Sequence, residues 1–280
     1  MRILPDLPDL QIIPTSALCP HEHPEEGRSG PIAEAVQKDG VLRNPPIVLQ
    51  LAGEPERYVV LDGANRTTAF GVLGIEDILA QVVHPGDTRV EVETWNHAIL
   101  DLPEPELTQV LAAIPEVGLV PSDPEQAAVD LQLGSGLAYL SLRGGRVVCL
   151  VADVPDMARR VDGLHRIVGA CKANARVERT NAREFHELEG VFPTIGGLAV
   201  FRSFTVQDVV ESVSQGLLLP GGLTRFVVSP RALRVNYPLE SLAAPQPRAI
   251  KQQALEAWLR ARVAGRRVRY YAEATYLFDE

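Results

Sequence analysis

Short apolar runs and amphipathic stretches alternate along the first third of the chain. Aliphatic and β-branched runs, flanked by Pro, Gly or charged residues, predict strands at 10–13, 47–51, 58–61, 78–83 and 88–94. Helical spacing predicts short helices over 31–38 and 65–73, and Gly40 and Gly74 follow them as stop signals. This part of the chain is therefore predicted to form a compact mixed α/β unit.

The remainder of the chain carries longer helical patterns. Apolar positions at helical spacing predict helices over 154–172, 205–215 and 249–263, and Thr205 and Asp208 have the spacing of a capping box. Strands are predicted at 137–142 and 146–151, joined by a Gly-rich turn, and at 225–228, 233–237 and 268–278. Five prolines between residues 101 and 125 mark a candidate domain boundary.

Composition and charge limit the classes of protein to which the chain can belong. Of its 280 residues, 46% are hydrophobic and 22% are charged, which is ordinary for a globular protein and untypical of a disordered one. Lys and Arg number 27 against 36 Asp and Glu, so the net charge is −9. This charge argues against nucleic acid as a partner, because nucleic-acid affinity comes mostly from cationic contacts to phosphate. The only dense basic cluster is Arg262, Arg266, Arg267 and Arg269.

Targeting and redox signals indicate the compartment. No apolar run reaches 18 residues, and the start of the chain contains Asp6 and Asp9 among three prolines, so neither a transmembrane helix nor a signal peptide is predicted. Cys19, Cys149 and Cys171 show neither CxxC nor zinc-site spacing. We therefore expect a cytoplasmic protein with reduced thiols and no membrane contact, present as a monomer or a dimer.

A strand, a carboxylate, a glycine and a helix follow one another around residue 62. The free N–H groups and the dipole of the helix start favour an anion, and Gly63 lets the backbone approach it closely. Arg66 adds a fork of donors suited to phosphate, and Asp62 is a candidate ligand for a divalent metal beside the phosphates. The segment has no Walker lysine, so it is not a P-loop. The alternative is a common strand–turn–helix corner with a surface arginine.

Carboxylates and imidazoles crowd the segment from Pro20 to Arg28. His21, His23 and three glutamates lie within six residues of a predicted loop. One of these carboxylates is a candidate general base for a substrate hydroxyl, and the two histidines are candidate metal ligands. The alternative is a solvated acidic loop, which is the usual state of a charge run.

A glycine-rich turn and an aromatic segment supply candidate groups for a small-molecule site. Thr224 and Arg225 follow a Pro-Gly-Gly turn at 220–222, where the arginine is suited to bind a carboxylate bidentately and the threonine adds a hydroxyl. Trp95 at a strand end, with His97 close behind it, is a candidate wall of such a site. The alternatives are a hairpin turn with an exposed arginine, and a tryptophan that belongs to the core.

The order and spacing of these residues resemble one family. The unit from Leu10 to Thr94 is similar to the ParB/sulfiredoxin-like nucleotide-binding fold, and the chain as a whole resembles the free L-serine kinases. The resemblance rests on five motifs, spread from the first tenth of the chain to its last residues: His21-Glu22-x-x-Glu25-x-x-Arg28, Asp62-Gly63-x-x-Arg66, Thr94-Trp95-x-His97, Pro220-x-Gly222-x-Thr224-Arg225-Phe226 and Arg269-Tyr270-Tyr271-x-Glu273-x-x-Tyr276-Leu277. The stretch from about residue 99 to 200 matches the family poorly.

That family phosphorylates the hydroxyl of free L-serine to O-phospho-L-serine with ATP or, in some members, ADP. The resemblance implies that Glu22 is the base on the serine hydroxyl and that Asp62 orients this hydroxyl or a magnesium ion. It implies a nucleotide-binding segment made of Gly63, Ala64, Asn65, Arg66, Thr67 and Thr68. It implies serine-binding groups at Trp95, His97, Thr224 and Arg225. This chemistry is coherent, because phosphoryl transfer depends mostly on positioning and on neutralising charge.

The resemblance also implies a domain organisation. We expect a mixed α/β (α+β) fold with a ParB/sulfiredoxin-like nucleotide-binding domain at 1–98 and an α+β domain at 99–280. Because motifs from both halves are needed, the active site is predicted in the cleft between them.

Departures from the family leave alternatives open. Asn65 stands where related members often have His, and the absence of Cys from this loop argues against sulfinic-acid reduction. One alternative is a ParB-like nucleotide-dependent regulator or DNA-binding protein without kinase activity, which would use the basic cluster near the C-terminus. Another is a kinase for a different small hydroxy compound, such as threonine.

Overall fold

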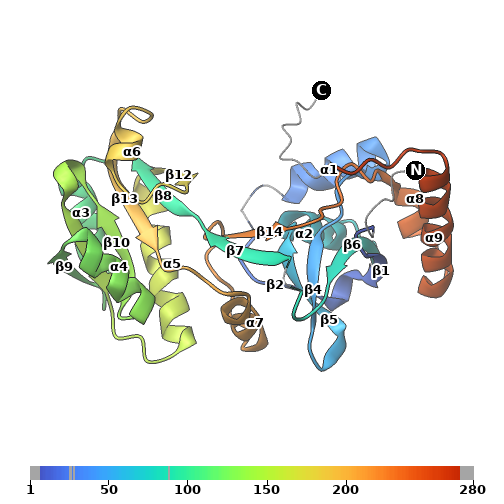
Figure 1. The fold of residues 1–280 in the computed structure, drawn as a ribbon, viewed down its shortest axis with the longest axis horizontal. Helices are drawn as coiled ribbons and strands as arrows, with labels where there is room; N and C mark the ends of the chain where they lie inside the picture. Colours follow the sequence, from blue (N-terminus) through green and yellow to red (C-terminus); the bar gives the residue numbers. More distant parts are fainter. Residues whose placement is uncertain (1–6, 25–26, 28, 88, 272–280) are drawn as a thin grey trace. The chain divides into compact units, whose positions relative to one another are not determined.

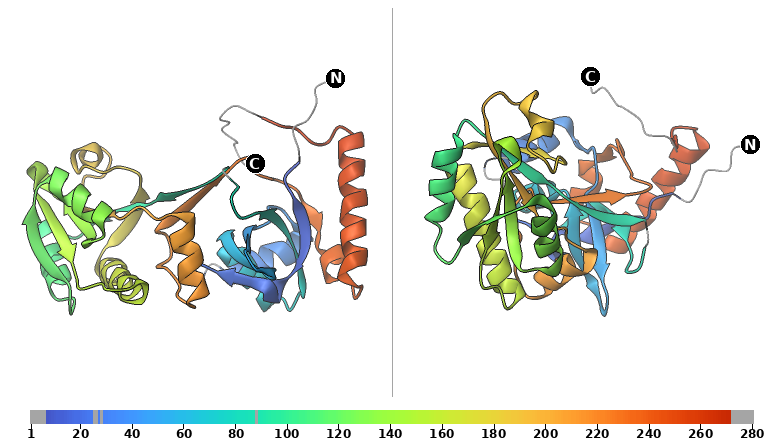
Figure 2. Two further views of the ribbon diagram at one scale, coloured as in Figure 1. Left: turned by 60° about the horizontal axis from the view of Figure 1, so that its bottom comes forward. Right: turned by 60° about the vertical axis from the view of Figure 1, so that its left-hand side comes forward.

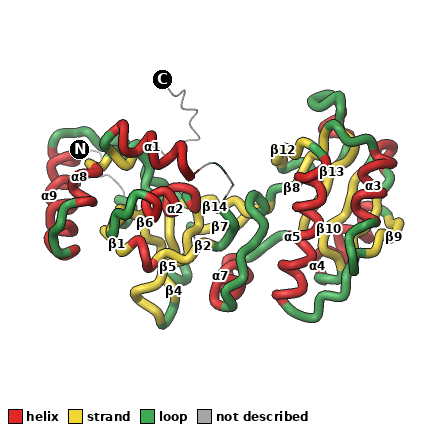
Figure 3. Tube along the Cα trace, turned by 180° about the vertical axis from the view of Figure 1, so that it is seen from behind, coloured by secondary structure: helices red, strands yellow, loops and turns green. Residues whose placement is uncertain are grey.

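The chain folds into two compact units, each containing helices and strands (Figures 1 and 3). The computed structural model describes residues 7–24, 27, 29–87 and 89–271. The first unit comprises Met1–Leu18, Glu26–Asp87 and Ser229–Glu280, and the second comprises Cys19–Glu25 and Thr88–Val228. The predicted mixed α/β class is therefore confirmed. The division differs from the single boundary expected at residue 98, because the chain returns to the first unit for its last segment.

A five-stranded sheet forms the centre of the first unit, in the order β1-β6-β4-β5-β2. β1 pairs antiparallel with β6, and β4 pairs antiparallel with β5 but parallel with β6. The aliphatic runs form strands because their side chains are buried on the sheet, and β6 is buried along its whole length. The strands are β1 (Leu10–Pro14), β2 (Leu18–Pro20), β4 (Ile47–Leu51), β5 (Glu54–Asp62) and β6 (Asp77–Val83), with a short pair of β3 (Val41–Leu42) and β15 (Tyr237–Pro238).

Four helices complete the core of the first unit. They are α1 (Ser29–Asp39), α2 (Ala64–Val72), α8 (Leu239–Ala243) and α9 (Arg248–Ala264). Val36, Phe70, Leu242 and Leu255, one from each helix, belong to the same buried cluster as the strand residues. α9 packs beside β1 (Figure 1). Residues after 229 are therefore as much a part of this core as the strands and helices between residues 10 and 83.

A six-stranded antiparallel sheet forms the centre of the second unit, in the order β12-β8-β13-β10-β11-β9. Its strands are β8 (Asn96–Leu100), β9 (Gly118–Ser122), β10 (Gly136–Ser141), β11 (Val147–Val151), β12 (Arg176–Thr180) and β13 (Ile195–Phe201). β10 and β11 pair antiparallel, which confirms the hairpin predicted at 137–151. A separate two-stranded ribbon joins β7 (Val90–Thr94) and β14 (Thr224–Val228).

Helices cover both faces of this sheet (Figure 2). They are α3 (Glu104–Ala112), α4 (Pro124–Leu133), α5 (Met157–Asn174) and α6 (His186–Glu189), whereas α7 (Val206–Ser214) lies beside β7 (Figure 1). Leu131 of α4 and Leu188 of α6 share one buried cluster with Leu198 of β13. The preceding residue, Gly197, faces the other side, where Leu107 of α3 packs against it.

Local signals explain several element boundaries. The capping box of Thr205 and Asp208 is present at the start of α7, and Asp156 caps α5 by accepting from the N–H of Arg159. The proline-rich stretch at 101–125 is not a boundary, because its prolines begin α3 and α4 inside the second unit.

Two predicted strands near the C-terminus differ from the structure. Of the strand expected at 233–237, only Tyr237 pairs, with β3. Of the strand expected at 268–278, residues 268–271 are irregular and the remainder lies outside the described residues.

Within the described ranges, no helix combines the length and the apolar character needed to cross a bilayer.

Candidate functional site

A glycine shapes the turn between β5 and α2. Gly63 has φ +96°, and a Cβ there would lie 3.0 Å from both Arg66 Cζ and Pro46 Cβ. Both the left-handed backbone and the close packing favour glycine. α2 therefore begins abruptly at Ala64, and its N-cap residue, Gly63, has no side chain that could cap it. The N–H groups at a helix start favour a bound phosphate.

Arg66, which the sequence predicted to bind phosphate, holds this turn together. Its Nη1 donates to the carbonyl oxygens of Asn44 (2.6 Å) and Pro45 (3.2 Å), and its Nη2 donates to Oδ2 of Asp62 (2.8 Å). The guanidinium group thereby ties the loop before β4 to the end of β5. Most of its donors are already used inside the protein.

The threonines of the first helical turn are also engaged within the helix. Oγ1 of Thr67 donates to the carbonyl of Gly63 (3.1 Å), and Oγ1 of Thr68 donates to that of Ala64 (3.0 Å). Asn65 is half-buried in the same turn. Backbone N–H groups are therefore the main donors that this turn offers to an anion.

A second arginine, which sequence reasoning missed, lies against Asp62. Arg231 donates from Nη2 to Oδ2 of Asp62, the same oxygen that accepts from Arg66. The Arg231 side chain is 37% exposed, and within the described chain Asp62 is its one ion-pair partner. It lies 169 residues from Asp62 in the sequence, so no local motif could have identified it.

The surroundings of Asp62 do not fit the predicted magnesium ligand. Its Oδ2 lies between two guanidinium groups, whose positive charge opposes a cation at the same oxygen. Across the described ranges, no three His, Cys, Asp or Glu side chains are grouped so that they could hold a metal ion. This applies equally to His21 and His23, the other candidate ligands from the sequence.

Glu22 is anchored in the second unit. Its Oε2 accepts from the backbone N–H of Gly222 (3.0 Å), and its side chain is 23% exposed. The backbone on either side pairs with Leu219, whose N–H donates to the carbonyl of His21 (2.8 Å) and whose carbonyl accepts from the N–H of His23 (3.1 Å). The alternative of a fully solvated charge run therefore does not hold for Glu22.

The glycine-rich turn before β14 is packed too tightly for side chains. A Cβ at Gly221 would lie 2.7 Å from a backbone oxygen of the Glu22 segment, and one at Gly222 would lie 2.6 Å from Nε of Arg179. Gly222 also has φ +88°. Nζ of Lys172 donates to the carbonyl of Gly221 (3.0 Å). Lys172 and Arg179, neither of which the sequence singled out, therefore help to place the turn that holds Glu22.

His97, which was predicted to contact substrate, lies beneath the same turn and is 1% exposed. Burial lowers its pKa from 6.5 to about 4, so the ring is neutral at pH 7. A neutral ring binds a carbonyl oxygen only as a donor, so Nε2–H donates to the carbonyl of Gly222 (3.1 Å). Nδ1 is buried without a hydrogen-bond partner among the described residues. In this structure His97 positions the turn and does not face solvent.

Thr224 and Arg225 point to opposite faces of β14, as successive strand residues do. Oγ1 of Thr224 is 2.7 Å from Nε2 of the buried His21. Arg225 instead pairs with Glu93 (2.9 Å), and its guanidinium carbon lies 5.0 Å from the ring centroid of Trp95. The structure thus groups Thr224 with the Glu22 segment, and it groups Arg225 with Trp95.

Parts of two family motifs lie outside the described residues. They are Glu25 and Arg28 of the N-terminal motif, and Glu273, Tyr276 and Leu277 of the C-terminal motif.

Comparison with curated proteins finds relatives with one activity. No protein-family model matches the chain. The chain is 23% identical over 246 residues to the ATP-dependent L-serine kinase SbnI of Staphylococcus aureus, an alignment that covers 83% of this chain and 84% of that protein. It is 33% identical over 89 residues to an ATP-dependent L-serine kinase of Staphylothermus marinus, which covers 32% of this chain and 35% of the relative.

Solved structures share the fold. C-terminally truncated SbnI from Staphylococcus aureus matches with a TM-score of 0.72 at 19% identity, covering 91% of this chain and 97% of that one. A mutant free serine kinase in complex with ADP matches with a TM-score of 0.71 at 16% identity, covering 84% of this chain and 94% of that one. In sequence over most of its length, and in fold, the chain is therefore a relative of the free L-serine kinases.

Proposed function

We propose that this protein transfers the terminal phosphoryl group of ATP to the hydroxyl of free L-serine, giving O-phospho-L-serine and ADP. The observation that carries the proposal is the anchored carboxylate of Glu22, which the N–H of Gly222 holds in place. Two curated relatives are named ATP-dependent L-serine kinases, and this supports serine as the acceptor and ATP as the donor.

Glu22 is the proposed base. A bond forms between the serine Oγ and the terminal phosphorus, while the bond from this phosphorus to the bridging oxygen of ADP breaks. The hydroxyl proton passes to Glu22 and then to solvent. Because the N–H of Gly222 binds Oε2, the other carboxylate oxygen is left to accept the proton.

The turn after Asp62 is the proposed phosphate site. The first N–H groups of α2 supply donors, and Arg231 supplies the positive charge for the phosphates. Arg66 is less suited to this role because it donates to backbone carbonyl oxygens. Magnesium enters as MgATP, as part of the substrate, since protein-bound Mg²⁺ commonly keeps its water and phosphate ligands and takes few carboxylates.

Several finer predictions stay predictions. They are serine binding by Trp95, Thr224 and Arg225, a direct contact from His97, placement of the active site in a cleft, use of ADP as a donor, a cytoplasmic location, and a monomeric or dimeric state.

The direct test is an assay of the full chain with MgATP and one hydroxy compound at a time. We expect ADP and O-phospho-L-serine to form together, and only when L-serine is present. ³¹P nuclear magnetic resonance measures both products. L-Threonine, D-serine and glycerol are the matched acceptors, and ADP in place of ATP tests the donor. ADP release at the same rate without serine, or a phosphorylated product only from another acceptor, would refute the proposed function.

Arg231→Gln is expected to weaken ATP binding about 10-fold or more, because a charge-assisted hydrogen bond contributes about 1.5–3 kcal/mol. Adenosine, which has no phosphate, is expected to bind the variant and the wild type alike. Isothermal titration calorimetry measures both. Arg66→Gln is the matched comparison, and we expect it to lower the melting temperature, since it removes the bonds to Asn44 and Pro45. Unchanged ATP affinity in Arg231→Gln would contradict the role given to this arginine.

A further inference from the structure

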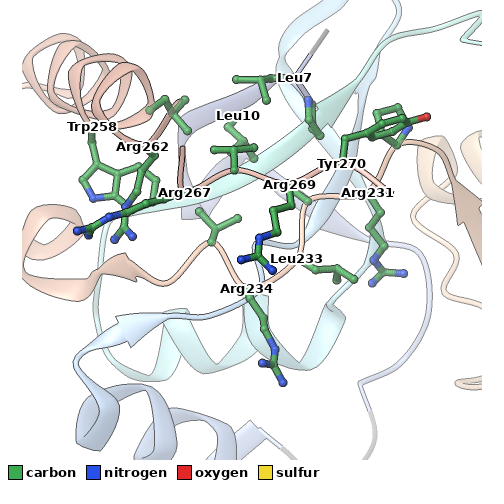
Figure 4. A pocket seen from close by; sticks show the side chains of 16 residues that line it. Leu7, Leu10, Arg231, Leu233, Arg234, Trp258, Arg262, Arg267, Arg269 and Tyr270 are labelled. Atoms are coloured by element: carbon green, nitrogen blue, oxygen red, sulfur yellow. The ribbon is translucent and has the colours of Figure 1, made fainter. Parts of the chain in front are cut away.

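The densest basic segment of the sequence borders a cavity in the first unit. Five arginines and no acidic residue occur between positions 260 and 269, in a chain of net charge −9. Three of them line a cavity of about 200 Å³, together with two arginines from the segment after β14 (Figure 4): Arg231, Arg234, Arg262, Arg267 and Arg269. Arg231 also belongs to the phosphate turn, whereas the three arginines of the C-terminal segment border this cavity and, within the described chain, make no hydrogen bond or ion pair to that turn.

Acidic side chains are absent from the described lining of this cavity, although Arg231 pairs with Asp62 outside the lining. Arg262 stacks on Trp258, with the guanidinium carbon 4.5 Å from the ring centroid. Arg260, on the same helix but not part of the cavity, instead pairs with Glu256 at 3.7 Å. Several like charges around one cavity raise its potential and favour an anion.

The remaining walls of the cavity are apolar. Leu7, Leu233 and Tyr270 are 42%, 54% and 48% exposed, which is much for large apolar side chains that gather at one place. Figure 4 shows Arg262 and Arg267 beside Trp258 on one side, Arg231 on the other, and Leu233 between them. A simple inorganic anion would leave these apolar surfaces in water.

We propose that this cavity binds a small organic anion that has an apolar body and at least one carboxylate or phosphate group. Guanidinium forks match both kinds of group bidentately. The indole of Trp258 and the leucine side chains bury the apolar body of the ligand. This site shares Arg231 with the proposed phosphate turn, but Arg262, Arg267 and Trp258 have no role in the proposed kinase activity.

Phenyl phosphate, which has an aromatic ring and a phosphate group, is the probe. The chain has two tryptophans, so in a Trp95→Phe background the fluorescence reports on Trp258 alone. We expect phenyl phosphate to change this fluorescence and to bind at least 10-fold more tightly than either phenol or inorganic phosphate. Phenylacetate in place of phenyl phosphate tests whether a carboxylate serves as well.

Two variants test whether the arginines of the cavity bind the phosphate group of the probe. Arg262→Gln/Arg267→Gln is expected to weaken phenyl phosphate binding at least 10-fold, and Arg260→Gln, the matched control on the same helix, is expected to bind it like the wild type. With Trp95 intact, the double variant is expected to form O-phospho-L-serine at the wild-type rate and to melt at the wild-type temperature. Loss of the anion site and loss of the kinase activity are thereby distinguishable.

Four outcomes would overturn the proposal. The first is binding of phenyl phosphate no tighter than that of phenol or inorganic phosphate, and the second is unchanged binding in the double variant. The third is complete displacement of the probe by stoichiometric MgATP, which would make the cavity part of the nucleotide site. The fourth is salt-sensitive displacement by duplex DNA, which would make the basic segment a nucleic-acid surface.

Discussion

Glu22→Gln is expected to lower the turnover number for O-phospho-L-serine formation about 10²–10⁴-fold, the usual contribution of a general base. The amide oxygen of Gln can still accept from the N–H of Gly222, so the turn keeps its anchor. The amide cannot take the serine proton. We therefore expect turnover to fall while the affinity for ATP, measured by calorimetry, and the melting temperature stay close to those of the wild type.

Glu91→Gln is the matched control for this experiment. Glu91 is a glutamate of the same unit, exposed on β7, and it should turn over serine normally when changed. A Glu22→Gln variant whose turnover number stays within about threefold of the wild type would remove Glu22 from the role of base. Loss of ATP binding together with turnover would indicate a structural role for this carboxylate instead.

Lys251→Met is expected to lower the free energy of unfolding by about 3–5 kcal/mol, the usual cost of breaking a buried ion pair. Asp77 and Lys251 are 6% and 5% exposed, and Nζ donates to Oδ2 of Asp77 (2.8 Å) and to the carbonyl of Leu242 (2.6 Å). Arg248, which also donates to Asp77 (3.0 Å), is half-exposed and only partly compensates the buried carboxylate once Lys251 is lost. Urea denaturation of both proteins measures the difference.

Two further variants test whether the unpaired buried carboxylate of Asp77 causes the loss of stability in Lys251→Met. Asp77→Asn in the Lys251→Met background is expected to recover part of the lost stability, because it removes the buried charge that Lys251 no longer pairs. Arg260→Gln breaks an exposed pair with Glu256 on the same helix and is expected to cost at most about 0.5 kcal/mol. Equal free energies of unfolding for Lys251→Met and the wild type would show that the Lys251–Asp77 pair does not stabilise the protein.

The same pair makes stability depend on pH. Burial raises the pKa of Asp77, but the hydrogen bonds and charges of Lys251 and Arg248 outweigh burial and lower it below the ordinary value of 3.8. A lowered carboxyl pKa stabilises the folded state above about pH 4, and this stabilisation is lost as the pH falls through the lowered pKa. The stability gap between wild type and Lys251→Met should therefore narrow below about pH 4. The buried His97 titrates in both proteins and cancels in this difference.

Local patterns predicted most elements of the fold. The predicted helices at 65–73 and 205–215 correspond to α2 and α7, since turn glycines and a capping box act over a few residues. The domain boundary predicted at the proline-rich stretch was wrong, because proline not only interrupts helices but also begins them. Most of the strand predicted at 233–237 does not form, because an apolar alternation becomes a strand only where the edge of another strand is available for pairing.

For the candidate site, residue types and local turns could be predicted from the sequence: the carboxylate at Glu22, the glycine after Asp62 and the helix that begins beyond it. The groups that these residues contact could not, because the contacts join segments that are far apart in the chain. Arg231 reaches Asp62 across 169 residues, and the N–H of Gly222 reaches Glu22 across 200. Hydrophobic periodicity encodes contacts between residues a few positions apart, whereas pairings at such separations arise from the packing of whole elements.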